Sequence, residues 1–94
     1  MANQIKQAIF RGKKYKIVWS TKDGLGQCEH PSTKGKKIIL NPTLKGKELI
    51  RVAVDEGIHA CCWDLGNEEV GEMSESISNF LWELGVRVIE KEQE

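Results

Sequence analysis

The sequence is short of cysteine pairs, of long apolar runs and of glycine-rich phosphate loops. Its three cysteines, Cys28, Cys61 and Cys62, are odd in number and two of them are adjacent. This pattern does not favour a disulfide framework, and reduced thiols are expected. No apolar run approaches the ~18 residues that a membrane span needs. The segment Gly24-Leu25-Gly26 indicates a single turn, because a phosphate loop needs a longer glycine pattern that opens a helix.

Histidine is also scarce, since His30 and His59 are the only two in the chain. No Ser/His/Asp arrangement for nucleophilic catalysis is therefore indicated. The first residues lack the apolar core of a secretory signal, and together with the reduced thiols this predicts a cytoplasmic protein.

What is present is the composition of one small globular domain, 1–94, with 39% hydrophobic and 30% charged residues. The net charge of zero hides a split: residues 1–51 carry twelve Lys or Arg against three Asp or Glu, and residues 52–94 carry two against eleven. A basic half could touch nucleic acid or an acidic partner. We favour two halves that face each other or solubilise separate surfaces, because the lysines are scattered rather than clustered.

Hydrophobic periodicity divides the chain into segments. In order, they are an N-terminal segment at 1–9, a β-meander of three short strands at 10–42, a helix at 44–65, a second helix at 67–85 and a frayed tail at 90–94. Tyr15, Ile17 and Trp19 alternate as in a half-buried strand. The short turn at Gly66-Asn67 makes the helices an antiparallel hairpin. The predicted class is α+β, with a three-stranded antiparallel sheet packed on this hairpin.

The second helix carries apolar residues at helical spacing, and we expect this face to pack against the first helix, with Ser74 and Ser78 permitting close approach. The face consists of Val70, Met73, Ile77, Phe80 with Leu81, and Leu84.

The most informative stretch is Asp55-Glu56-Gly57-Ile58-His59, which differs by one residue from the zinc-binding pattern H-E-x-x-H. Asp55 and His59 are one helical turn apart on one face, so a single ion can reach both. Glu56 is rotated by about 100° from Asp55, and from there a carboxylate can take a proton from a water held by the metal. The pattern predicts Asp55 and His59 as metal ligands and Glu56 as the catalytic base.

A third protein ligand is expected from the acidic second helix. Glu69 is the carboxylate nearest to the apolar face, and Glu72 is the next choice. Carboxylates in the first turn also stabilise a helix N-terminus without any metal.

Other roles for these residues remain open. Arg51 and Asp55 could form an i, i+4 ion pair, and His59 could be a core histidine. Cys28, His30, Cys61 and Cys62 offer soft ligands for structural zinc, but their spacing is uncommon. For Cys61 and Cys62 we favour the interpretation as small buried hydrophobes.

Residues 15 to 87 resemble small phage and bacterial metallopeptidases of the zincin type. The resemblance lies in the order and content of a series of short motifs. They are Gly26, Cys28, Glu29 and Pro31; the strand Ile38 to Leu40; Glu56, His59 and Ala60; Trp63-Asp64-Leu65; Glu68-Glu69; and Leu81-Trp82-Glu83-Leu84-Gly85.

The resemblance implies a minimal zincin core and a divalent metal, with zinc as the first expectation. It also implies that Glu56 is the general base and His59 a ligand. Asp55 stands where the family has its first histidine. A carboxylate there hardens the site and adds negative charge, which favours manganese or magnesium, weakens zinc binding or abolishes catalysis.

The expected function is a metal-dependent, metallopeptidase-like hydrolase of phage or prophage origin, located in the host cytoplasm if phage-encoded. Its substrate would be a peptide or protein, which could add as a strand to the sheet edge beside the motif helix. The alternative is an inactive zincin-like scaffold that binds a protein partner. Nucleic-acid binding through the lysines is the least favoured function, because few aromatic residues are available to stack on bases.

Overall fold

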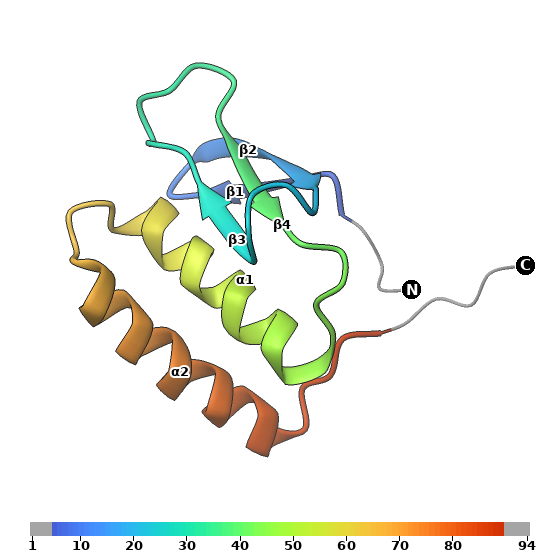
Figure 1. Cartoon of the computed structure of the whole chain (residues 1–94). Coiled ribbons are helices and arrows are strands. Elements are labelled where there is room, and N and C mark those ends of the chain that lie inside the picture. Colours follow the sequence, from blue (N-terminus) through green and yellow to red (C-terminus); the bar gives the residue numbers. More distant parts are fainter. Residues whose placement is uncertain (1–4, 90–94) are drawn as a thin grey trace, which may run out of the picture.

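The computed structural model describes residues 5–89, so the expected tail at 90–94 and the first four residues lie outside the described part of the chain. Four strands precede two helices (Figure 1). The elements are β1 (Gln7–Phe10), β2 (Lys13–Trp19), β3 (Gly26–Cys28), β4 (Lys37–Leu40), α1 (Gly46–Cys61) and α2 (Asn67–Leu84).

The sheet confirms the α+β class but corrects the expected topology. Its four strands lie in the order β1-β2-β4-β3, and β2 pairs with β4 in parallel, while the two outer pairs are antiparallel. The prediction of a three-stranded antiparallel meander was therefore wrong. The strand Lys-Ile-Ile-Leu of β4 has three buried residues and takes the interior position, whereas the short Gly-Gln-Cys of β3 lies at the edge.

β1 begins inside the segment expected to precede the sheet. It pairs with β2 through a two-residue turn at Arg11 and Gly12, whose φ angles are 51° and 78°. Two successive positive φ angles are the requirement of a type I′ hairpin turn. The first central residue of such turns is most often Asn, Asp or Gly, so the arginine gave no turn signal in the sequence.

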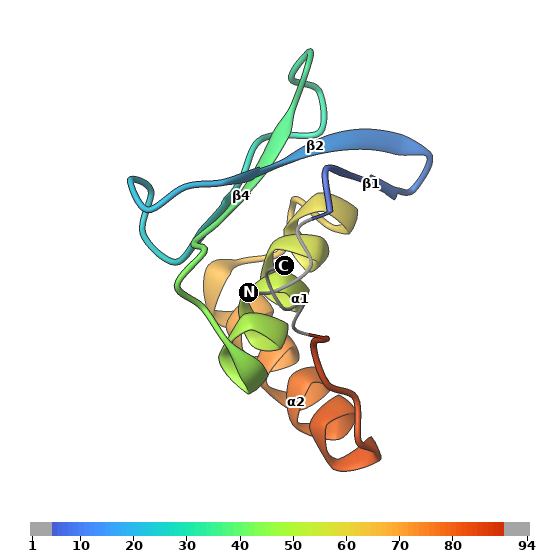
Figure 2. The same cartoon turned by 90° about the vertical axis from the view of Figure 1, so that its right-hand side faces the viewer.

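The core lies between one face of the sheet and α1 (Figure 2). Tyr15 is fully buried at its centre, with its ring edge-to-face on Phe10 at 5.7 Å between centroids. The other buried members are Ile17, Ile38 and Leu40 from the sheet, Leu44 from the preceding loop, and Leu49, Val52 and Ala60 from α1.

α1 is shorter than the expected 44–65 at both ends. Lys45 is extended before the first helical residue, with φ −142°. At the other end Cys62 leaves the helix with φ −139°, and Leu65 N–H donates to the Cys62 carbonyl at 3.1 Å in the turn that follows.

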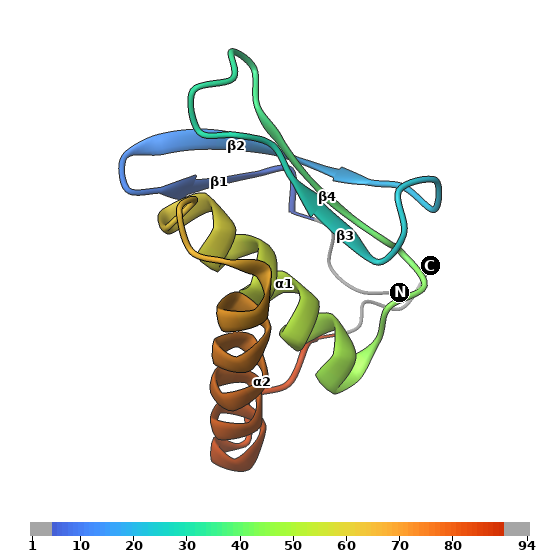
Figure 3. The ribbon, with the colours of Figure 1, turned by 60° about the vertical axis from the view of Figure 1, so that its left-hand side comes forward.

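α2 packs on α1 and contacts no described strand, so it lies on the side of α1 away from the sheet (Figure 3). Its buried residues are Val70, Ser74 and Ser78. The expected packing face is wrong in part, because Ile77 and Phe80 are 41% and 60% exposed. The two small serines let the helices approach closely, and this rotates the larger apolar side chains out of the contact. No helix among residues 5–89 is long and apolar enough to cross a bilayer.

Replacing Tyr15 tests this core. Tyr15→Ala is expected to lower the free energy of unfolding by about 3–5 kcal/mol, as large-to-small core changes do. Tyr15→Phe should cost less than about 1 kcal/mol, since the hydroxyl lies 3.5 Å from its acceptor, the Ala60 carbonyl. Urea unfolding of both variants measures the difference. A loss below about 1 kcal/mol in Tyr15→Ala would contradict the central position of this ring.

Candidate metal centre

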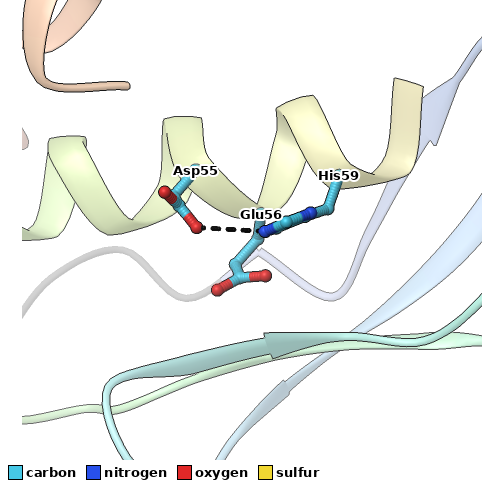
Figure 4. Close-up of side chains that lie close together, drawn as sticks. All are labelled: Asp55, Glu56 and His59. Atoms are coloured by element: carbon cyan, nitrogen blue, oxygen red, sulfur yellow. Dashed lines mark ion pairs between the residues drawn. The ribbon is translucent and has the colours of Figure 1, made fainter. Parts of the chain in front are cut away.

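Three ligand-capable side chains converge on the face of α1 next to β3. One ligand atom each from Asp55, Glu56 and His59 lies within 4.8 Å of the other two. Asp55 and His59 approach each other across one helical turn, and Glu56 points towards the neighbouring strand (Figure 4). The convergence follows from the i, i+1, i+4 spacing of the motif on a regular helix.

The separation of Asp55 and His59 suits a single metal ion. His59 Nε2 lies 3.4 Å from Asp55 Oδ2. Two atoms that bond to one tetrahedral zinc ion at about 2.0–2.1 Å lie about 3.3 Å apart. Oxygen and imidazole nitrogen are ligands that zinc and manganese both accept. The donors present therefore fit a divalent cation in distance and in chemistry.

Ser74 of α2 fixes the orientation of Asp55. Its hydroxyl lies 3.0 Å from Asp55 Oδ1 and 3.1 Å from the Gly71 carbonyl, so its one proton is shared between the two acceptors. Ser74 is fully buried. With Oδ1 engaged by Ser74, Oδ2 is left facing the imidazole. A buried outer-shell partner of this kind holds a ligand in position for metal binding.

Glu56 is the buried member of the group, with 6% of its surface exposed. Burial, and secondarily the charge of Asp55, raises the pKa of its carboxyl group from 4.5 to about 7. The burial depends on Gly26 in β3. A Cβ at that position would lie 2.7 Å from Val52 Cγ1 and 2.9 Å from Glu56 Oε2, which is closer than packed atoms tolerate. Only glycine lets the strand backbone cover Glu56.

The three side chains open into a cleft of about 510 Å³ between β3 and α1. Its wall combines the strand, the motif residues and the turn into α2. The lining residues are Gly26, Gln27, Cys28, Asp55, Glu56, His59, Trp63, Leu65 and Asn67.

Glu69 is not brought into the group. Its Oε1 accepts the backbone N–H of Gly66 at 3.1 Å, which is the one hydrogen bond of a capping box that a glycine N-cap can form. Glu72 is exposed and also lies outside the group. Asn67, however, lines the cleft, so the first turn of α2 borders the site.

The contacts of these residues bear on the alternative roles considered for them. Arg51 lies 4.0 Å from Glu48, and Asp55 contacts His59 instead. Cys28, Cys61 and Cys62 are free thiols and join no group of three ligands among the described residues. The interpretation of Cys61 and Cys62 as buried hydrophobes was wrong, because Cys61 is half-buried and Cys62 is exposed. Burial, then the charges of Glu56 and Glu29, raises the pKa of Cys28 to about 12. Its thiol therefore stays protonated in the metal-free chain.

Little in the sequence indicated that two further residues, Ser74 and Gly26, belong to the site. Ser74 was expected to permit close helix packing, but its bond to Asp55 joins positions 19 residues apart and follows no local pattern. Gly26 was attributed to a turn. Its contact with Glu56 became visible only with the position of β3.

In comparisons with known proteins, no family model, no curated protein and no solved structure matches this chain. The resemblance to zincin-type metallopeptidases therefore stays a prediction, and the function is argued from the geometry of the site.

The raised pKa of Glu56 has a measurable consequence for stability. Between pH 4.5 and pH 7 the folded, metal-free chain keeps a proton that the unfolded chain has lost, so its free energy of unfolding falls as the pH rises. Across this window, we expect the free energy of unfolding of the wild type to fall by up to about 3 kcal/mol more than that of Glu56→Gln. Urea unfolding at stepped pH in the presence of a chelator measures it.

The exposed Glu72 supplies the control, because Glu72→Gln removes a carboxyl of the same type without burial. A plot of the free energy of unfolding of Glu72→Gln against pH should stay parallel to the plot for the wild type. If the Glu56→Gln curve were also parallel, the carboxyl would not have the raised pKa.

Proposed function

We propose that the chain is a metal-dependent hydrolase acting on peptides, with its reaction centre at Asp55, Glu56 and His59. The observation that carries the proposal is the 3.4 Å separation of His59 Nε2 and Asp55 Oδ2, with a buried carboxyl beside them. Two ligands at metal-binding distance next to a carboxyl with a pKa near 7 are the parts that metal-assisted hydrolysis requires.

Each residue has one task in this proposal. Asp55 and His59 hold the cation, zinc in the first place and manganese or magnesium as alternatives. Ser74 keeps Asp55 aligned. When bound, the cation supplies a Lewis acid that makes water more acidic and polarises the carbonyl group of the substrate. Glu69 or Glu72 stays the proposed third ligand, and Glu69 would have to release the Gly66 N–H to serve.

Glu56 moves the proton. In its ionised form it takes a proton from the attacking water, whose oxygen bonds to the carbonyl carbon of the peptide. It then donates that proton to the leaving nitrogen as the C–N bond breaks. In the metal-free chain burial raises the pKa of this carboxyl to about 7, and a bound cation would lower that pKa and favour the ionised form that accepts the proton.

The position of β3 supports a peptide as the proposed substrate. This strand lies at the edge of the sheet, and its residues Gly26, Gln27 and Cys28 form one wall of the cleft. An extended peptide can add to a sheet edge through backbone hydrogen bonds. A peptide placed there would run past Glu56, which lies directly beneath Gly26.

Hydrolysis of a peptide library by the metal-loaded chain tests the proposal. Glu56→Gln should lower kcat at least 100-fold, the usual contribution of a general base, while metal content stays near that of the wild type. Ser74→Ala should weaken metal binding about 10-fold or more, because Asp55 loses its outer-shell partner. Undiminished hydrolysis in Glu56→Gln would contradict the assigned role.

The third ligand has a matched pair of variants. Glu69→Gln keeps a side-chain oxygen for the Gly66 N–H, so the cap and the stability are retained, while the charged ligand is removed. Weaker metal binding in this variant but not in Glu72→Gln would select Glu69. The reverse result would select Glu72.

The outer face of α2 favours a second candidate function, a protein-binding module. Ile77, Phe80 and Leu84 form an exposed apolar stripe, with Leu84 65% exposed. α2 carries five glutamates and no Lys or Arg. This charge fits a partner helix that has an apolar stripe with basic flanks.

A synthetic amphipathic helix with leucines on one face and lysines on its flanks is the probe for that function. It should bind the wild type but not Phe80→Ser/Leu84→Ser, whereas Ile9→Ser, which removes a 65% exposed side chain on β1, should bind normally. A version with glutamate flanks should not bind. Equal binding of the probe by all three proteins would contradict the assignment of a binding surface to this stripe. If the wild type forms a dimer and the double substitution abolishes it, the partner on this surface is a second copy of the chain.

A further inference from the structure

A second hollow of about 750 Å³ lies beside the metal centre, between the β1–β2 hairpin and the end of α1. It is not used by the hydrolytic chemistry proposed above. Its wall includes Arg11 and Lys13 from the hairpin, His30 and Pro31 from the loop after β3, and Trp63 and Asp64 from the turn after α1.

This hollow and the cleft of the metal centre meet at Trp63, which lines both. The Trp63 ring lies edge-on to His30 at 4.9 Å and edge-on to His59 at 6.2 Å between centroids. Trp63 therefore lies next to both His59, the candidate metal ligand, and His30, which lines the hollow. A peptide whose scissile bond lies at Glu56 can place a neighbouring group beyond Trp63.

The backbone at Arg11 is unusual for its residue type. Its φ of 51° is left-handed, and it is the one non-glycine residue with positive φ among residues 5–89. Asn, Asp or Gly would suit the first central position of the turn better. Such strain in a residue that lines a cavity points to a role for the side chain.

One role of Arg11 is visible in the fold. Its Nη1 donates to the Cys61 carbonyl at 3.0 Å, which satisfies a carbonyl at the end of α1. The same contact covers the partial negative charge of the helix end, which would otherwise repel an anion from the hollow. A guanidinium group has five N–H donors, so this contact engages only part of its capacity.

His30 adds a donor of defined orientation. Its Nδ1 accepts the backbone N–H of Ser32 at 3.0 Å and lies 2.7 Å from the Ser32 hydroxyl. The ring proton of the neutral imidazole is then on Nε2, so the side chain offers an N–H donor. The wall also has a net positive charge, because Arg11 and Lys13 contribute two positive charges and Asp64 contributes the one negative charge.

We propose that this hollow is a recognition subsite for a carboxylate of the peptide, with Arg11 as the specificity-determining residue. The carboxylate belongs either to an Asp or Glu side chain near the scissile bond or to the C-terminus of the peptide. Guanidinium and carboxylate groups match in shape and charge, and their hydrogen bonds are among the stronger ones in proteins. The inference rests on the proposed peptide substrate, but binding can be measured without hydrolysis.

The test measures peptide binding to the Glu56→Gln chain by NMR titration, once with zinc and once with a chelator. Three peptides with a blocked N-terminus are compared: one with Glu and a blocked C-terminus, one with Gln at the same position and a blocked C-terminus, and one with Gln and a free C-terminal carboxylate. We expect a carboxylate peptide to bind about tenfold more tightly than the neutral one at low salt, with resonance shifts at residues 10–13, 30–31 and 60–65.

Substitutions in the same background assign the effect to Arg11. Arg11→Asn suits the left-handed turn position and should reduce the preference to less than about twofold. Arg11→Lys should keep part of it. Lys22→Asn removes an exposed charge that does not line the hollow and should leave the preference unchanged.

The outcomes separate the subsite from the proposed function. A preference for the Glu peptide assigns the carboxylate to a side chain, and a preference for the free terminus assigns it to the chain end; both support the subsite. Equal binding of all three peptides, or a preference that survives Arg11→Asn, would overturn it. If the metal-loaded wild type cleaves no peptide while the Arg11-dependent preference is present, the proposed hydrolysis fails and the subsite stands.

Discussion

The close approach of the β3 backbone to α1 at Gly26 is the contact on which the candidate site depends. The strand lies so near the helix that even one methyl group would meet Val52 and Glu56 at less than 3 Å. The contact covers Glu56 while Asp55 and His59, on the neighbouring side of the helix, stay partly open to the cleft. One packing contact thus separates a buried carboxyl with a raised pKa from two more accessible side chains that could bind a metal, which is the division that acid–base chemistry beside a metal needs.

The second helix completes the site from the other side and changes its own surface in doing so. Because small serines form its contact with α1, Ser74 reaches Asp55 directly. The same rotation leaves Ile77, Phe80 and Leu84 outside the core. The orientation of Asp55 and the exposure of an apolar stripe are therefore two results of one helix packing. A larger residue at position 74 would bury more apolar surface but would displace the carboxylate.

The sequence was sufficient for the features that depend on local periodicity. The i, i+4 spacing of Asp55 and His59 predicted their shared face, and the change of period from Leu44 onward predicted two helices after a sheet. Features that join distant segments were not accessible in this way. β4 lies between β2 and β3 because the chain goes from β2 to the edge strand β3 and then returns to pair with both, and this order is not encoded in the periodicity of any one segment. Glu69 was selected by its angle on the helix, but the Gly66 N–H, an unpaired donor at the helix start, offers a nearer partner.

In the proposed metal centre, oxygen and nitrogen ligands of the motif helix, rather than the three thiols, hold a divalent metal. X-ray absorption spectroscopy of the zinc-loaded chain tests this assignment most directly, because Zn–S bonds of about 2.3 Å differ clearly from Zn–N and Zn–O bonds of about 2.0–2.2 Å. The expected result is about one zinc ion per chain with oxygen and nitrogen neighbours only, one of them an imidazole. A sulfur shell, or a chain that retains no zinc, would contradict the account.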